Sequence, residues 1–238
     1  MPRQGIVFLA VPDGFVAETA ARLARMDPDL GLSFVHLSGA LGLDALSSLR
    51  GHALGSFHPL QSFPFPREPG AFHGITVAVD ATSGPLMRRL RTLARELGAK
   101  PHHVSERDRA AYHAAAVYAS NFVDVVIAEA VRMLEKIGWT EEASLEALLP
   151  LVEGALANIR DKGPVRALTG PIRRGDADTV RRHLGVVDNP DLYRMLALVA
   201  LEIAQQAGLD PAAAGRTRKT LVTRALTPDV AATRRRRR

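Results

Sequence analysis

The feature that most constrains this sequence is a long apolar stretch with no helix breaker. Neither glycine nor proline occurs between Ser105 and Ile137. Residues 112–127 read YHAAAVYASNFVDVVI, in which only His113 and Asp124 could carry charge near neutral pH. This pattern predicts one uninterrupted helix of roughly 50 Å, and its apolar residues on every side predict that it is buried all round. A membrane span is not expected, because the uncharged run is shorter than the ~20 residues required.

Three polar side chains are set into this apolar helix. Ser120 and Asn121 fall about 20° and 80° from His113 around a helical wheel, so the three share one broad face. Buried polar groups need hydrogen-bond partners. The face therefore fits either a core helix whose polar groups are satisfied within the fold or a helix that contributes to a site.

Composition limits the class of protein. The 238 residues are 47% apolar, enough for two modest domains or one large one. The absence of cysteine excludes thiolate catalysis and disulfides and fits a cytoplasmic protein. The chain starts without the charged and small-residue signature of a signal peptide, which also favours the cytoplasm.

The net charge of +6 belongs to the C-terminal end. From Ala212 onward there are nine basic residues and one acidic residue, so this segment carries +8 and residues 1–211 carry −2. The five arginines of 234–238 could bind nucleic acid or anionic lipid. A solvated, disordered tail over residues 212–238 is the interpretation we favour, without nucleic acid as a partner.

Strands alternate with helices in the first part of the chain. Apolar runs of strand length, bounded by glycine, proline and polar clusters, predict an α/β unit over residues 1–104 with a mostly parallel sheet. The expected strands are 5–11, 33–37, 53–57, 75–81 and 100–104, and the expected helices are 14–25, 86–97 and a short one within 38–49.

Only helices are expected over residues 105–211. A second helix begins at Thr140, is bent by Pro150 and ends at Gly163-Pro164. A loop over 166–176, a short helix from Asp176 to His183 and a helix from Pro190 to about Ala207 follow. The fold class is therefore α/β followed by all-α.

Ligands of open α/β sheets bind beyond the carboxyl ends of the strands. His58, which follows a strand and precedes Pro59, is the sharpest candidate at these ends, because imidazole can give or take a proton near neutral pH. A structural His at a strand end is the alternative. The chain has neither GxGxxG nor GxxxxGK[ST], so no phosphate-binding motif is present, and the histidine spacing predicts no metal site.

Five segments together resemble one family. FLAVPD, HLSGAL, GSFHPLQSF, YHAAAVYASN and ALTGPIRRGD occur in an order similar to that of bacterial Rossmann-like proteins with a C-terminal helical domain of unknown function. These are distant relatives of pyrroline-5-carboxylate reductase, in the superfamily with a 6-phosphogluconate dehydrogenase-like C-terminal domain. The resemblance covers residues 5 to about 209.

The resemblance implies an NAD(P)-binding domain, a helical domain that forms a homodimer, and a cleft between them for a small substrate. It places the cofactor at the strand ends and the catalytic groups at His58 and on the central helix, where related dehydrogenases usually carry Lys and Asn. The implied catalytic residues are His58, His113 and Asn121; the cofactor-binding residues are Val11, Pro12, Asp13, Ser38 and Gly39; and the substrate-binding residues are Ser120, Thr169, Gly170 and Arg173.

One departure from this family affects the expected function. The family's sheet begins with a strand–GxGxxG–helix unit, whereas this sequence starts near the fourth strand, so a truncated Rossmann-like sheet is expected, with strand 5–11 at its edge. We expect NADP or NAD to bind this chain weakly or not at all. Two functions stay open: an NAD(P)-dependent oxidoreductase, and a non-catalytic dimeric protein that binds a ligand or a partner.

Overall fold

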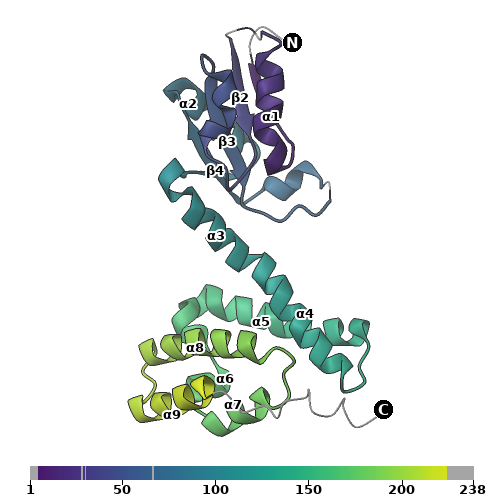
Figure 1. The fold of residues 1–238 in the computed structure, drawn as a ribbon, viewed down its shortest axis with the longest axis vertical. Helices are drawn as coiled ribbons and strands as arrows, with labels where there is room; N and C mark the ends of the chain where they lie inside the picture. Colours follow the sequence, from purple (N-terminus) through teal and green to yellow (C-terminus); the bar gives the residue numbers. More distant parts are fainter. Residues whose placement is uncertain (1–4, 28, 30, 66, 224–238) are drawn as a thin grey trace, which may run out of the picture. The chain divides into compact units, whose positions relative to one another are not determined.

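A computed structural model describes residues 5–223, apart from 28, 30 and 66 (Figure 1). The chain divides into two compact units, Met1–Val125 and Val126–Arg238. This division lies inside helix α4 (Asn121–Glu135) rather than at residue 105, so the first half of the central helical stretch belongs with the sheet. The arginine run 234–238, and the disorder predicted for it, lie outside the described residues.

The first unit is built on a five-stranded sheet in the order β1-β2-β3-β4-β5. Strands β1 to β3 are parallel, β4 runs antiparallel to β3, and β5 is parallel to β4. The α/β expectation is confirmed, and β1 lies at one edge of the described sheet. The strands are β1 (Gly5–Leu9), β2 (Leu32–His36), β3 (Ala53–Pro59), β4 (Thr76–Ala81) and β5 (Lys100–His103).

Two apolar cores hold helices against the two faces of this sheet. Helix α1 (Asp13–Ala24) and the 3₁₀ segment η1 (Leu43–Leu49) pack on the face that carries Phe34. Helix α2 (Gly84–Glu96) packs on the opposite face, which carries Val35, and Figure 1 shows α1 and α2 on opposite sides of the strands. The inner strands β2, β3 and β4 are largely buried on both faces, which explains why their sequences are mainly apolar.

The central helix is not continuous, contrary to the sequence prediction. A 3₁₀ turn (η3, Glu106–Asp108) leads into α3 (Arg109–Ala119), and α4 (Asn121–Glu135) follows after a break. At the break Ser120 has φ −129° and ψ −83°, outside the helical region. Neither glycine nor proline marks this position. The carbonyl of Ser120 still accepts from the amides of Val123 and Asp124, which restarts the helix.

The prediction of a helix buried all round is also wrong for the single chain. Tyr118 is 71% exposed, and Phe122, Val125 and Val126 are 43–47% exposed. By length and composition alone, the stretch Glu106–Glu135 could cross a membrane, with a mean hydropathy of 1.5 and 6% of its most apolar window buried. A single helix that passes this test is weak evidence for a membrane span. The exposed side chains belong to a surface that no described element covers.

The second unit is helical. Helix α5 (Glu141–Ala167) begins with the Thr140 hydroxyl capping the amide of Ala143, and its backbone breaks at Gly163, where φ is 73°. Figure 1 shows α6 to α9 close together beyond α5, with a shared core that includes Leu201 and Leu221. These helices are α6 (Gly170–Arg174), α7 (Ala177–Leu184), α8 (Pro190–Gln206) and α9 (Pro211–Val222).

Two expectations for this unit need correction. The segment 166–176 is not a plain loop, because α6 forms within it. The basic tail does not start at residue 212, because α9 occupies 211–222 and buries Ala213, Ala214, Thr217 and Leu221. Small and apolar residues at helical spacing give α9 a core-facing side despite its arginines, and packing of that side orders the helix.

Candidate functional site

Three polar side chains form a row across one face of the sheet. His36 on β2 is in register with Ser56 on β3, and Ser56 is in register with Asp80 on β4. Residues that are directly opposite on neighbouring strands point to the same face. The row therefore lies on the face of Phe34, where η1 and the start of α3 meet the sheet, in place of the apolar side chains found elsewhere.

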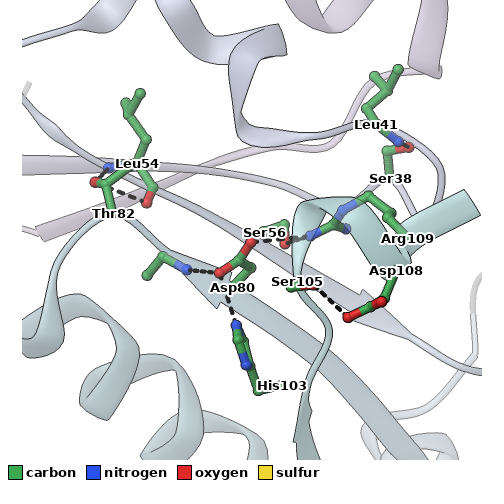
Figure 2. Close-up of polar contacts among 11 residues, drawn as sticks. Ser38, Leu41, Leu54, Ser56, Asp80, Thr82, His103, Ser105, Asp108 and Arg109 are labelled. Carbon is green, nitrogen blue, oxygen red and sulfur yellow. Dashed lines mark hydrogen bonds and ion pairs between the residues drawn. The ribbon is translucent and has the colours of Figure 1, made fainter. Parts of the chain in front are cut away.

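Arg109, the first residue of α3, covers this row. Its Nη2 donates to Ser56 Oγ at 2.8 Å and lies 3.8 Å from Asp80 Oδ2, as Figure 2 shows. Asp80 Oδ1 also accepts from the Ala81 amide at 2.9 Å and lies 3.2 Å from His103 Nε2. The side chain of Arg109 is only 2% exposed, so Asp80 is the counter-ion of a buried charge.

This arrangement fixes the electrostatics around the strand ends. Burial lowers the pKa of Arg109, and the charge of Asp80 opposes that shift. Burial, with the nearby charge of Arg109 as the next cause, lowers the pKa of His36 from 6.5 to about 4. His36 is therefore neutral near pH 7 and acts as a polar member of the core rather than as a cation.

Two histidines and a tyrosine meet beside this row. His58, two residues after Ser56 on β3, accepts from or donates to the Tyr112 hydroxyl through Nδ1 at 2.8 Å. The ring of His113 lies edge-on to that of His58, with centroids 6.4 Å apart. Gly39 lies under both: a Cβ there would be 2.7 Å from His58 Nε2 and 3.0 Å from His113 Nδ1. A Cβ at this position would require the imidazoles to shift.

The same residues line a cavity of about 660 Å³ within the first unit. Its polar groups come from the end of β3, from α3 and from the first turn of α4. Ser120, at the break between the two helices, and Asn121, the first residue of α4, are both part of this lining. Its polar and charged lining residues are His58, Gln61, Ser62, Tyr112, His113, Ser120, Asn121 and Asp124, and Leu60, Val117 and Val123 with three alanines complete it.

The protonation of the His58–Tyr112 pair follows from its surroundings. Burial lowers the pKa of His58, and the charges of His113 and Arg109 lower it further. Burial raises the pKa of Tyr112. Both groups are thus neutral near pH 7 and share one proton across their hydrogen bond. A neutral imidazole in a partly apolar cavity can take a proton from, or pass one to, a small polar substrate.

The residues predicted to bind the cofactor lie close together but do not form a phosphate site. Ser38 Oγ donates to Asp13 Oδ2 at 2.7 Å and accepts from the amides of Ala40 and Leu41 at 3.1 and 3.0 Å. Those amides are therefore not available to a ligand. The α1 N-terminus, the usual position for a pyrophosphate, carries the acidic Asp13 in its first turn.

NAD(P) accordingly does not fit these residues as a dinucleotide. The space above Gly39 is filled by imidazole rings, and Val11 and Pro12 add no charged or donor side chain. A pyrophosphate needs free amide donors and positive charge. The amides of Ala40 and Leu41 are already bound by Ser38, and Asp13 puts a negative charge in the first turn of α1, so we assign no step of a reaction to the cofactor in this chain.

The other predicted substrate residues lie in the second unit. Thr169 is the N-cap residue of α6, and Gly170 begins that helix with φ 86°. Arg173 donates through Nη2 to the carbonyl of Ala207, at the end of α8, at 2.9 Å. This bond satisfies a free carbonyl at the end of a helix, which is a structural role. Among the residues described, no cluster of His, Cys, Asp and Glu could hold a metal ion.

Sequence reasoning missed Arg109, Ser56, Asp80 and Tyr112. In the sequence Arg109 stands in the polar run SERDR, which is typical of an exposed first turn. One signal was available: Ser56 and Asp80 interrupt strands that are otherwise apolar, and polar residues buried in a strand require a partner. The identity of that partner depends on tertiary packing.

The family of the chain follows from its sequence. The model of a domain of unknown function, DUF2520, matches residues 75–203, more than half of the chain. The chain belongs to the DUF2520 family. The match covers β4, β5 and all of the helices from α2 to most of α8, including the residues of α3 and α4 that line the cavity. No curated protein sequence matches the chain.

Solved structures similar to this DUF2520 chain share its fold. A Thermotoga maritima protein is 26% identical, with a TM-score of 0.71 over 87% of this chain and 81% of its own. A Bacteroides fragilis protein, provisionally assigned as an NADP oxidoreductase, is 24% identical, with a TM-score of 0.71 over 84% of this chain and 75% of its own. A Plasmodium falciparum pyrroline carboxylate reductase with NADP bound is 13% identical, with a TM-score of 0.56 over 90% and 76%.

These similarities confirm the Rossmann-like sheet followed by a helical domain, as the sequence predicted. The fold is shared with a protein provisionally assigned as an NADP oxidoreductase and with a pyrroline carboxylate reductase.

Proposed function

We propose that this chain provides the substrate-binding and proton-transfer part of an NAD(P)-dependent oxidoreductase that acts on a small polar substrate. The observation that carries the proposal is the His58–Tyr112 hydrogen bond at 2.8 Å on the wall of a cavity of about 660 Å³. The NADP oxidoreductase fold of the similar structures supports this reaction class.

In this proposal His58 exchanges a proton with the polar atom of the substrate, and Tyr112 orients the imidazole and passes on the proton. The depressed pKa of His58 leaves it neutral at neutral pH, so it acts first as an acceptor when an alcohol or amine is oxidised. In the direction of reduction, protonated His58 donates the proton to the substrate. Asn121 and Ser120 supply hydrogen bonds that position the substrate, and the alanines of α3 bound a small apolar volume.

The proposal is tested by turnover at millimolar NADPH, which offsets weak cofactor binding, with a panel of ketones and cyclic imines. His58→Asn should lower kcat by about 10²–10⁴-fold, with little change in substrate affinity measured from the shifts of the histidine NMR signals. Ser62→Ala, which changes a cavity residue away from the hydrogen bond, is the matched control. Turnover that is equal in wild type and His58→Asn would refute the role of His58.

A second candidate function is a non-catalytic ligand-binding protein of the same fold. The observation that favours it is that Ser38 Oγ, at the end of β2, already binds the amides of Ala40 and Leu41. In that case the panel compounds would shift the signals of His58 and His113, but NADPH would not be consumed at any concentration.

We further propose that the chain acts as a homodimer through its helical part. Large apolar side chains on α4, α5 and α8 are about half exposed in the single chain, and such surfaces are typical of obligate dimers. A symmetric pairing of two copies would bury them. These side chains are Phe122, Val125 and Val126 on α4, Leu149, Leu151, Leu156 and Ile159 on α5, and Met195, Leu196 and Val199 on α8.

A further inference from the structure

The helical unit contains a cavity that the proposed reaction does not use. It has a volume of about 780 Å³ and lies between α7, α9 and the turn that precedes α7, with one residue from α8. Four cationic and two acidic side chains line it, which leaves a net charge of +2. The lining residues that matter here are Arg181, Arg194, Arg216, Lys219, Asp176, Asp178 and Thr220.

The two acidic groups of this basic cavity already have partners. Asp176 caps α7: its Oδ1 accepts from the Thr179 amide at 3.0 Å, and its Oδ2 accepts from the Thr179 hydroxyl at 2.7 Å. Asp178 pairs with Arg181, three residues along the same helix. Neither carboxylate therefore neutralises the charge of Arg194, Arg216 or Lys219.

Arg194 is a largely buried cation whose donors are only partly used. Its side chain is 17% exposed, and its Nη1 lies 3.1 Å from Asp191 Oδ1, a carboxylate that is 82% exposed. Its Nε is buried and has no hydrogen-bond partner in the described part of the chain. A buried guanidinium donor without an acceptor is costly, and Arg194 is one of the residues that line the basic cavity.

Arg216 and Lys219 bring two further charges to the same cavity from α9. They are three residues apart and therefore neighbours on one face of the helix. Within residues 5–223 as described, no salt bridge involves either of them. Their long side chains can close over a ligand that Arg194 holds from α8.

We propose that the basic cavity of the helical unit binds a phosphate-bearing anion. Guanidinium groups match phosphate oxygens in two-point contacts, and a lysine adds a mobile point charge. The Thr220 side chain adds a hydroxyl donor, and the net charge of +2 suits the dianion of a phosphate monoester. The site lies within α7–α9 and does not depend on the reaction proposed for the sheet unit.

The proposal is tested by adding inorganic phosphate, pyrophosphate or phenyl phosphate to the full ¹⁵N-labelled chain and following the backbone amide signals. Shifts at Gly175, Gly185 and Thr220, which line the basic cavity, are expected. The double variant Arg216→Ala/Lys219→Ala should weaken binding by at least about tenfold, since each charge-assisted hydrogen bond is among the strong ones. Tighter binding of phenyl phosphate than of phosphate would identify an organic phosphate as the ligand. Tighter binding of inorganic phosphate or pyrophosphate would identify one of these free anions instead.

The control is Arg218→Ala, which removes an arginine from the same helix outside the cavity lining and should change affinity less than about twofold. Unchanged melting temperatures of both variants would exclude unfolding as the cause. Shifts confined to the arginine-rich residues 224–238, or equal loss of binding in the control and the double variant, would overturn the proposal.

Discussion

Removal of the charge of Asp80 should destabilise the sheet unit strongly. Asp80 is the counter-ion of Arg109, whose side chain is 2% exposed, at 3.8 Å. At an effective dielectric constant of about 20, two unit charges at this distance attract by about 4 kcal/mol. In Asp80→Asn that attraction is lost while the shape and part of the hydrogen bonding remain. We therefore expect a loss of about 3–4 kcal/mol, in the range known for a buried ion pair that loses one partner.

A second variant separates charge from packing. Arg109→Met in the Asp80→Asn background removes the unpaired cation and fills the space with an apolar chain, so it should recover most of the lost stability. Ser56→Ala, which removes a neutral acceptor of Arg109, is the matched control and should cost about 1–3 kcal/mol.

Native-state hydrogen exchange of the β3 and β4 amides measures the stability of this unit directly. Fluorescence of Trp139, the single tryptophan, reports on the helical unit and should be unaffected. A loss below about 1 kcal/mol in Asp80→Asn, or a double variant no more stable than Asp80→Asn, would show that Asp80 does not compensate the buried charge.

Three further predictions follow from the same geometry. The pKa of His36 is lowered from 6.5 to about 4, so between these pH values His36 stays neutral in the folded chain while it takes up a proton in the unfolded chain. The free energy of unfolding should therefore fall by about 3 kcal/mol as pH drops from 6.5 to 4 and then level off. Urea unfolding of His36→Leu should show a smaller fall over the same pH range. His113→Asn should raise the pKa of His58, since the charge of His113 lowers it. An NMR titration that gives the same pKa for His58 in the variant and the wild type would contradict this. Calorimetry with NADPH should detect weak binding or none, whereas micromolar affinity would mean that the phosphates have a site not recognised at the strand ends.

Much of the fold was determined by local sequence. Apolar runs of five to seven residues between glycine, proline and polar clusters gave strands β1 to β4, and helical spacing gave α1, α2 and α8 within a few residues. These features depend on period and on backbone chemistry, which the sequence contains directly. Helical spacing predicted that His113, Ser120 and Asn121 share a face, and the family resemblance added His58. The structure brings the four to one cavity, while their catalytic roles stay a proposal.

Other features were decided only by tertiary structure. The apolar run of β4 is the same for either strand direction, so its antiparallel pairing with β3 depends on the path of the chain before it. Residues 112–127 contain no helix breaker, yet Ser120 leaves the helical region, so helix propensity alone does not locate this break. Arg109 is in a polar sequence but is buried, since Ser56 and Asp80, more than twenty residues away, provide its partners. Local sequence does not predict contacts between residues so far apart in the chain. The contacts of Arg109 with Ser56 and Asp80 nevertheless form the electrostatic centre of the sheet unit.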